Sequence, residues 1–570
     1  MPPRRRKVAR PPARSAATAP TRLVNQRIGF LFAGFLLLLA VAIGRAGYLL
    51  AFEGGKLRSL AAGQQVVNVT VVAKRGTITD RRGTTLAASE DASTIFATPY
   101  LVKDPVGTAR KIAPLLKQPP AELTTTLADR KVGFAYLERK ADPRAGARIE
   151  RMEIEGIGVI DDARRYYPEG ELASQVLGTV GIDDKGLSGL EQALNSTLSG
   201  SDGKQRIVRD ARGDPVSLDE QRSERSGHDI RLTIDAQLQA RAESVLAGVG
   251  ETYQPEGASA IVMDPRNGQI LAMANWPGVN ANRIGDAPPS ARINHAVGLT
   301  YEPGSTFKAF TVAGALSDRL VTPNTTFSLG PAIQVADRTI LEAEEGTAYG
   351  TLNVGEILSH SSNVGAVTIG LKLGDERFDY WVRRFGFSNL TGVPVPGESA
   401  GIVPEVSEYS GSSMGNLPIG QGLAVTPLQM ADAYSAIANG GVLVRPHLIA
   451  GGAPDSTPPN RRVIPRRVSR HLQQMLKGVL GPGGTAPEAA VPGYDIAGKT
   501  GTAQKAENGG YSESKYVSSF IGFAPATNAR LLVAVIVDEP KGTYLGGKVA
   551  APAFEKIASF ALPYLGIAPN

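Results

Sequence analysis

The segment 301–320, YEPGSTFKAFTVAGALSDRL, is the stretch of sequence that says most about the fold. Proline and glycine at positions 303 and 304 provide a rigid approach, and the apolar spacing that follows is that of a helix. We therefore predict a helix that begins near Ser305. On one face of such a helix, Ser305 and Lys308 lie three positions apart, so that the lysine amine can reach the serine hydroxyl.

This pair of side chains could perform acyl transfer. Serine is a weak nucleophile until a base removes its proton, and lysine can be that base only if its pKa is lowered. Burial near a helix N-terminus and a second cation nearby would each lower that pKa. The same helix end offers a backbone N–H to a developing oxyanion. The simpler alternative, for an isolated pair of this kind, is that Ser305 caps a helix and Lys308 is solvated.

Two further patterns suggest other chemistries. Residues 493–500 fit G-x-x-x-x-G-K-T, the phosphate-binding P-loop, and an ATPase built around Lys499 is the main alternative. A P-loop requires a helix after the lysine, whereas Thr500-Gly501-Thr502 favours helix poorly. Residues 411–415 fit G-x-S-x-G, but their flanks are typical of a loop rather than of a strand and helix.

Composition excludes several classes of protein. The 570 residues include no cysteine, which rules out disulfides, thiol nucleophiles and iron–sulfur clusters. The five histidines show no metal-ligand spacing, so we expect no metal and no cofactor. The net charge of +7 is carried by eight basic residues in positions 1–27, and the rest of the chain is close to neutral. We therefore expect no nucleic acid partner.

The basic tail leads into an apolar run. Residues 28–44 carry no charge, and residues 28–50 are long enough to span a bilayer as a helix. We predict a single-pass anchor at 28–50, with residues 1–27 in the cytoplasm by the positive-inside rule and the remainder exported. A cleaved signal peptide is the alternative, although the apolar run exceeds the usual length.

The exported part divides at a polar stretch. Residues 66–100 are predicted to be strands and turns, and residues 104–150 helical. Residues 200–228 are polar and charged, which suits a hinge or boundary. We therefore predict one module at 51–228 and a second at 229–570.

The second module begins with a strand, a helix and a hairpin around Pro265–Gly268. Near its end, three apolar runs predict an antiparallel meander, and a helix follows at Pro552–Leu562. This order of elements indicates a mixed α/β domain with a large core.

Two short motifs follow the Ser305 segment, namely Ser361-Ser362-Asn363 and Lys499-Thr500-Gly501-Thr502. In this order, S-x-x-K, S-x-N and K-T-G resemble the active-site triplet of penicillin-binding proteins and serine β-lactamases. The flanking stretches also resemble transpeptidase signatures: YEPGSTFK, SSNVGA, GQG with TPLQ, and KTGTAQK. Earlier stretches resemble motifs of the class B pedestal: R-G-x-I-x-D-R-x-G at 75–83, R-x-Y-P at 165–168 and G-L-E at 189–191.

The chain thus resembles a class B penicillin-binding protein, a peptidoglycan D,D-transpeptidase, over nearly all of residues 28–570. The resemblance implies an α+β fold class. A single transmembrane helix would precede an elongated mixed α/β pedestal, the dimerisation-type domain at 51–228. The transpeptidase domain at 229–570 would hold a central antiparallel sheet flanked by helices. No glycosyltransferase signature of the bifunctional class A enzymes occurs.

The resemblance also implies catalytic roles. Ser305 would attack the penultimate D-Ala carbonyl of a stem peptide and release the last D-Ala, with Lys308 as the base. Ser361 and Lys499 would relay the proton to the leaving amine. A second stem peptide would then resolve the acyl-enzyme.

The remaining motif residues would bind substrate. Asn363 would orient the substrate amide, and the backbone N–H groups of Ser305 and Thr502 would form the oxyanion hole. Thr500 and Thr502 would hold the terminal carboxylate. A side chain at Gly501 would block the approach of a donor peptide lying along this strand. Simple alternation places Lys499 and Thr502 on opposite faces of that strand.

The stretches KTGTAQK, YVSSFIGFAPA and YLGGKVAAPAFEKI resemble the division-specific FtsI type, with an elongation-specific enzyme as the alternative. Implied partners are peptidoglycan stem peptides on lipid-linked precursor or nascent glycan, β-lactam antibiotics, a polytopic glycan polymerase and bitopic division proteins. The implied location is the bacterial inner membrane, with the catalytic domain in the periplasm. A β-lactam sensor, a carboxypeptidase and a scaffold with a vestigial site are further alternatives.

Overall fold

A computed structural model describes the chain at residues 21–49, 66–209, 215–344, 346–451, 460–507 and 509–569. The chain forms two compact units. One unit comprises Met1–Val71 and Gly203–Ser223. The other comprises Val72–Asp202 and Glu224–Asn570 and holds the candidate site.

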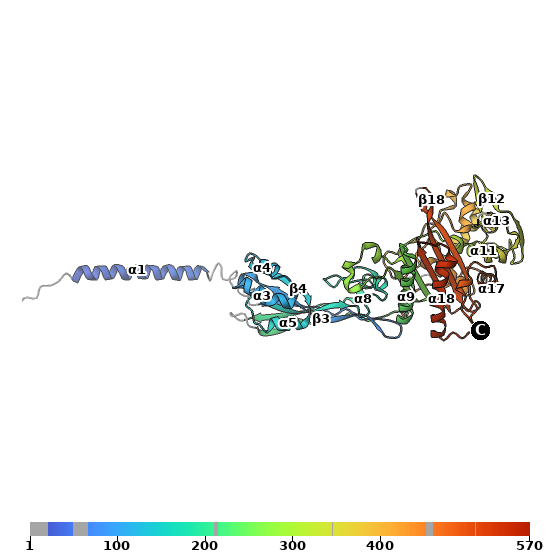
Figure 1. Cartoon of the computed structure of the whole chain (residues 1–570). Coiled ribbons are helices and arrows are strands. Elements are labelled where there is room, and N and C mark those ends of the chain that lie inside the picture. Colours follow the sequence, from blue (N-terminus) through green and yellow to red (C-terminus); the bar gives the residue numbers. More distant parts are fainter. Residues whose placement is uncertain are drawn as a thin grey trace, which may run out of the picture. The chain divides into compact units, whose positions relative to one another are not determined.

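The N-terminal unit contains one long apolar helix, α1 (Thr21–Tyr48) (Figure 1). Within it, Arg27–Tyr48 has a mean hydropathy of 2.2 and is long and apolar enough to cross a membrane, by length and composition. The predicted anchor at 28–50 coincides with this helix up to Tyr48. Most of the predicted basic tail lies outside the described residues.

The same unit contains a three-stranded sheet in the order β1-β6-β7. Its strands are β1 (Val66–Val71), β6 (Gly203–Arg209) and β7 (Pro215–Arg222). Two of these strands lie in the stretch 200–228, which we predicted to be a hinge. In this stretch the alternation of apolar and polar residues is short and is interrupted by charged residues, so the sequence pattern does not predict the two strands.

The larger unit begins with the pedestal, in which β3 is the long central strand. Its neighbours are β4, β5 and β2, and β2 in turn pairs in parallel with β8. The strands are β2 (Ile78–Thr79), β3 (Thr85–Ala97), β4 (Ala135–Ala141), β5 (Ile157–Tyr166) and β8 (Ile230–Arg231).

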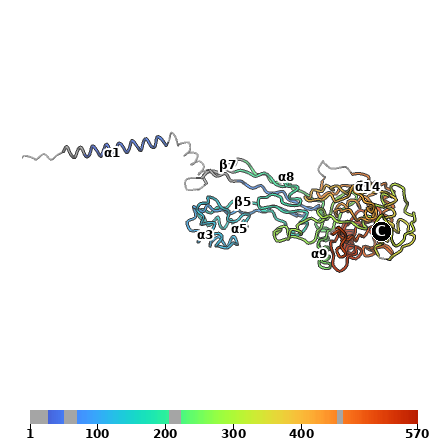
Figure 2. The backbone as a smooth tube through the Cα atoms, turned by 90° about the horizontal axis from the view of Figure 1, so that it is seen from above, coloured from blue at the N-terminus to red at the C-terminus, as the bar shows by residue number. Residues whose placement is uncertain are grey.

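Three helices pack around one end of β3 and β5 (Figures 1 and 2). They are α3 (Pro105–Leu116), α4 (Pro120–Ala128) and α5 (Pro143–Glu150). The stretch 104–150 is therefore helical as predicted, except that β4 interrupts it. Pairing with β3 decides the conformation of that segment, and such a long-range contact leaves little trace in the local sequence.

The second predicted module is built on a five-stranded antiparallel sheet in the order β10-β9-β19-β18-β17. The strands are β9 (Gly257–Asp264), β10 (Gln269–Trp276), β17 (Ala497–Glu507), β18 (Gly510–Ala524) and β19 (Leu531–Asp538). The predicted hairpin and C-terminal meander are both present. Strand β17 continues well past Lys499, so the P-loop alternative lacks the helix that it requires.

Helices cover both faces of this sheet, and its central strand β19 is apolar from Leu531 to Val537 for that reason. Leu531, Val533 and Val535 face α9 (Ala236–Tyr253) and α18 (Gly546–Tyr564). Alternate residues of β19, such as Leu532 and Ala534, contribute to the core of the other face. That core includes α11 (Lys308–Ser317), α13 (Asn363–Leu373), α14 (Asp375–Arg384), α16 (Pro427–Ala438) and α17 (Arg466–Lys477).

Candidate active site

Ser305 lies in a 3-10 turn, η5 (Gly304–Phe307), that leads directly into α11. The predicted helix start is therefore present. At Gly304, φ is +55°, and a Cβ there would lie 3.0 Å from Cβ of Ala503 and 3.3 Å from the carbonyl oxygen of Thr502. The glycine therefore allows the turn to pack directly onto β17, which brings Ser305 beside the K-T-G strand.

Two distant segments hold this turn in place. The backbone N–H of Gly304 donates to the carbonyl of Gly420 (3.0 Å), and the Tyr434 hydroxyl donates to the carbonyl of Thr306 (2.6 Å). A Cβ on Gly420 would lie 2.2 Å from the carbonyl oxygen of Gly304. The G-Q-G stretch and α16, the helix that begins at the T-P-L-Q stretch, thus both hold the turn.

Lys308 is completely buried, and its amine connects the Ser305 helix to the S-x-N motif. Its Nζ donates to Oδ1 of Asn363 (2.7 Å), to Oγ of Ser361 (3.3 Å) and to the carbonyl of Ser361. Burial lowers the pKa of Lys308 to about 7, although the nearby carboxylate of Glu342 opposes the shift. Near neutral pH, this lysine is therefore divided between its acidic and basic forms.

Ser361 occupies a strained backbone position, with φ of +62°, between α12 (Val354–Ser359) and α13. Left-handed backbone is unfavourable for a non-glycine residue and is often found at functional sites. The turn is fixed by Glu342, which accepts from the Ser362 hydroxyl (2.5 Å) and from the Asn363 N–H (2.6 Å).

Glu342, which is 6% exposed, was not predicted as a site residue from the sequence. It follows β13 (Arg338–Leu341) in the stretch LEAEEG, which has the composition of a solvated acidic loop. Only the fold shows that its carboxylate is the anchor of the S-x-N turn.

Lys499 on β17 is the second buried amine of the site. Its Nζ donates to the carbonyl oxygen (3.2 Å) and the hydroxyl (3.3 Å) of Thr500. Burial and the positive charge of Lys308 both hold the pKa of Lys499 well below its usual range. Because the two amines repel each other when charged, the pocket disfavours the state in which both lysines are protonated.

A glycine-rich loop, which was not predicted from the sequence either, joins the two sides of the site. Thr485 and Thr500 share a hydrogen bond between their hydroxyls (2.7 Å). On the same loop, the carbonyl of Gly483 lies 3.0 Å from Nδ1 of His360, the residue before Ser361. The loop thus links the S-x-N turn to the K-T-G strand.

Gly501 faces the Ser305 turn. A Cβ at this position would lie 2.3 Å from Oγ of Ser519 and 2.9 Å from the carbonyl oxygen of Pro303. Glycine is therefore required here for β17 to pack against the turn. The role that we predicted for Gly501, space for a donor peptide, stays a prediction. Thr502 accepts from the N–H of Gly546 (3.0 Å) at the start of α18.

The structure thus brings Ser305, Lys308, Ser361, Asn363 and the K-T-G strand to one place. Among the described residues, none forms a hydrogen bond with the Ser305 hydroxyl. No group of three or more histidine and acidic side chains that could hold a metal ion occurs in the described part of the chain. The G-x-S-x-G stretch leads into a helix of only four residues, Ser413–Asn416. It therefore does not form the strand–turn–helix of a nucleophile elbow.

Known proteins share this arrangement along most of the chain. The family model of the penicillin-binding protein transpeptidase domain matches residues 258–559, and that of the penicillin-binding protein dimerisation domain matches residues 70–232. Peptidoglycan D,D-transpeptidase FtsI of Escherichia coli K12 is 32% identical over 560 residues, which cover 96% of this chain and 93% of that protein. The chain belongs to the class B penicillin-binding proteins.

Other class B relatives are similar at the same level. PenA of Neisseria meningitidis is 34% identical (96% of this chain, 94% of that protein), and stage V sporulation protein D of Bacillus subtilis is 33% identical (96% and 87%). The crystal structure of penicillin-binding protein 3 of Mycobacterium tuberculosis with aztreonam superposes with a TM-score of 0.68 at 29% identity. That match covers 88% of this chain and 98% of that one. The predicted family, fold class and enzyme class are confirmed.

Proposed function

We propose that this class B penicillin-binding protein is a peptidoglycan D,D-transpeptidase that acts through an acyl-enzyme on Ser305. The observation that carries the proposal is the buried amine of Lys308, one helical turn from Ser305 and bonded to both Ser361 and Asn363. A lysine with a pKa of about 7 can accept the serine proton at neutral pH.

In the acylation step, Oγ of Ser305 bonds to the carbonyl carbon of the penultimate D-Ala. The bond from that carbon to the nitrogen of the terminal D-Ala breaks. The serine proton passes to Lys308 and then, through Ser361 and Lys499, to the leaving amine. The lowered pKa values of the two buried lysines support such a relay, since an amine whose pKa is lowered can accept a proton and release it again more readily.

The other motif residues bind the donor peptide. The backbone N–H groups of Ser305 and Thr502 stabilise the oxyanion, and the packing of the Ser305 turn on β17 supports their convergence. Asn363 orients the substrate amide, and Thr500 and Thr502 hold the terminal carboxylate. In deacylation, the amine of a second stem peptide bonds to the same carbon, the bond to Oγ breaks, and the amine proton returns to Ser305.

We further propose that α1 anchors the chain in the bacterial inner membrane, with the N-terminus in the cytoplasm. The arginine-rich sequence before the helix supports this orientation. We assign the domains as 51–228 and 229–570, and the enzyme to the division septum. The FtsI-like stretches in the last 75 residues support that role, and a glycan polymerase and bitopic division proteins are the partners that it requires.

Product analysis tests the reaction. Incubation with stem peptides that end in D-Ala-D-Ala should give cross-linked dimers and free D-Ala with the native chain, and neither with Ser305→Ala. Shortened monomers without dimers would identify a carboxypeptidase instead. For the cellular role, a fluorescent fusion should gather at mid-cell, and a uniform signal along the side wall would indicate the elongation alternative.

A further inference from the structure

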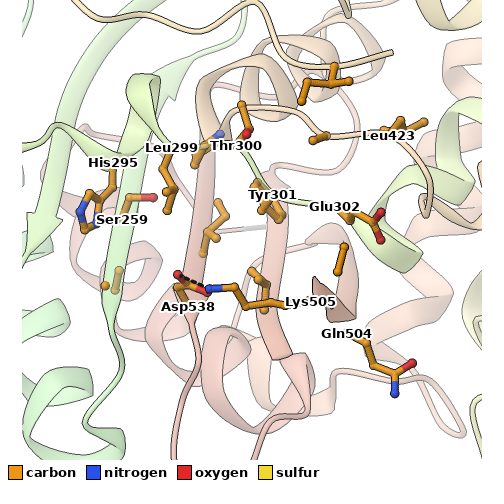
Figure 3. Close-up of a pocket in the computed structure, with 18 of the residues that line it drawn as sticks. Ser259, His295, Leu299, Thr300, Tyr301, Glu302, Leu423, Gln504, Lys505 and Asp538 are labelled. Atoms are coloured by element: carbon orange, nitrogen blue, oxygen red, sulfur yellow. Dashed lines mark hydrogen bonds and ion pairs between the residues drawn. The ribbon is translucent and has the colours of Figure 1, made fainter. Parts of the chain in front are cut away.

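The Ser305 turn and the S-x-N turn are attached to β17 in different ways. The Ser305 turn packs directly on this strand. Just before that turn, Tyr301 and Glu302 line a cavity of about 410 Å³ together with Lys505 of β17 (Figure 3). Among the described residues, by contrast, no hydrogen bond joins the S-x-N turn directly to β17. The two are connected instead through the 478–486 loop, which follows α17.

One end of the 478–486 loop is bonded to the residue before Ser361. Nδ1 of His360 lies 3.0 Å from the carbonyl oxygen of Gly483. A carbonyl can only accept, so Nδ1 of this imidazole carries the hydrogen. The ring of Tyr349 stacks on the same imidazole, with the ring centroids 5.4 Å apart and the planes inclined by 25°. These contacts fix the backbone directly before Ser361, the residue with the strained left-handed conformation.

The other end of the loop is bonded to β17. The hydroxyls of Thr485 and Thr500 are 2.7 Å apart, and the Thr500 hydroxyl also accepts from Nζ of Lys499 (3.3 Å). A Cβ on Gly547 would lie 2.3 Å from the carbonyl oxygen of Thr485, so this end of the loop also packs closely on the start of α18. The loop therefore reaches the residue that holds the second buried amine.

Between its two ends the loop is tightly folded. The N–H of Gly484 donates to the carbonyl of Gly481 (3.0 Å), and the N–H of Ala486 donates to the carbonyl of Val479 (3.0 Å). A Cβ on Gly484 would lie 2.2 Å from the carbonyl oxygen of Val479, and Ala486 is completely buried. The loop cannot lengthen without the loss of these bonds, so its two ends are expected to move together.

We propose that the 478–486 loop is a clamp that sets the spacing between the S-x-N turn and β17, with His360 and Thr485 as its positioning residues. His360 acts through Ser361, and Thr485 acts through Thr500 on Lys499. The inference rests on the proposed function, because the proton relay must cross from one side to the other. Since each hydrogen bond holds one end of the same loop, the loss of either should release the whole clamp.

The first test is a double-mutant cycle on acylation by fluorescent penicillin. His360→Phe keeps an aromatic ring and Thr485→Val keeps the side-chain shape, but each removes its hydrogen bond. Stopped-flow labelling should show the acylation rate constant lowered about tenfold in each variant, with the dissociation constant of the initial complex within about twofold of native. The double variant should also be about tenfold slower than native, rather than about a hundredfold, because both changes release one clamp.

Conservative variants and exposed controls separate positioning from general destabilisation. His360→Asn, whose amide N–H can replace that of Nδ1, and Thr485→Ser should each retain the native acylation rate within about threefold. His228→Phe and Thr252→Val, at exposed positions, should have no effect. Thermal unfolding of every variant shows whether the fold is retained. Independent losses that multiply to about a hundredfold, or single variants that acylate at the native rate, would overturn the proposal.

A second measurement does not depend on acylation. Hydrogen exchange, read by mass spectrometry on the full unliganded chain in detergent, reports whether the two ends are coupled. His360→Phe should speed exchange at least about threefold in the peptide that contains Thr500, and Thr485→Val should do the same in the peptide that contains Ser361. Changes confined to the substituted side would overturn the clamp, whereas a native chain that penicillin does not acylate would count against the proposed function alone.

Discussion

Replacement of Lys308 by methionine should stabilise the fold while it abolishes acylation. The native lysine has a pKa of about 7 when folded and 10.5 as its ordinary value. At pH 7, this difference lowers the free energy of unfolding by about 4 kcal/mol. Methionine removes that penalty but leaves acceptors on Ser361 and Asn363 without their donor, at a cost of about 2 kcal/mol. The net gain is about 2 kcal/mol, or on the order of 3 °C in Tm.

The gain should depend on pH in a defined direction. Between pH 7 and 10.5, the unfolded chain binds a proton that folded Lys308 does not, so the native chain becomes more stable as pH rises. The advantage of Lys308→Met should therefore vanish near pH 9, where the remaining penalty is about 2 kcal/mol.

Thermal unfolding of both chains in detergent from pH 6 to 9, with fluorescent penicillin labelling of each, measures both effects. Lys372→Met, at an exposed lysine on α13, is the matched control and should change stability by less than about 0.5 kcal/mol. A destabilised Lys308→Met at pH 7, or a difference that does not change with pH, would refute the reasoning.

Three further outcomes follow from the site. The rate of penicillin acylation should rise with pH and level off above about 7, because the basic form of Lys308 is required; stopped-flow labelling with a rate that does not depend on pH would contradict this role. Gly501→Ala should reduce acylation at least about tenfold and destabilise the fold by about 1–3 kcal/mol, since there is no space for the Cβ of alanine. Gly248→Ala, at a position with open space around it, is the control and should change neither acylation nor stability. Glu342→Gln should slow acylation about tenfold and lower the pH at which the acylation rate is half-maximal, because a carboxylate that raises the pKa of Lys308 is lost. Glu344→Gln, at an exposed glutamate, is the control. An unchanged midpoint in Glu342→Gln would argue against Lys308 as the base.

The sequence alone was sufficient to predict that the three motifs form one site, because they are short and stand in a fixed order, whereas the catalytic roles of their residues stay predictions. The fold brings Ser305, Lys308, Ser361 and Lys499 together although nearly 200 positions separate the first from the last. The apolar runs of the meander likewise predicted strands that the structure contains. These features are encoded locally, by residue type and by periodicity.

What the sequence did not reveal depends on long-range contacts. Glu342 belongs to an acidic stretch, and only its hydrogen bonds to the S-x-N turn distinguish it from a solvated glutamate. Nothing in the sequence distinguishes Thr485 from other threonines, and only the fold shows that its hydroxyl forms a hydrogen bond with that of Thr500. The packing requirement at Gly501 is a further example, since the atoms that exclude a Cβ come from Pro303 and Ser519.

The central claim is that the acyl group is carried by the Ser305 hydroxyl. Intact-mass spectrometry of the full chain after exposure to benzylpenicillin tests it most directly, with peptide mapping of the adduct. The account predicts one adduct per chain, on the peptide that contains Ser305, which is lost in Ser305→Ala and retained in Ser413→Ala. An adduct that persists in Ser305→Ala, or that maps to another serine, would contradict the account.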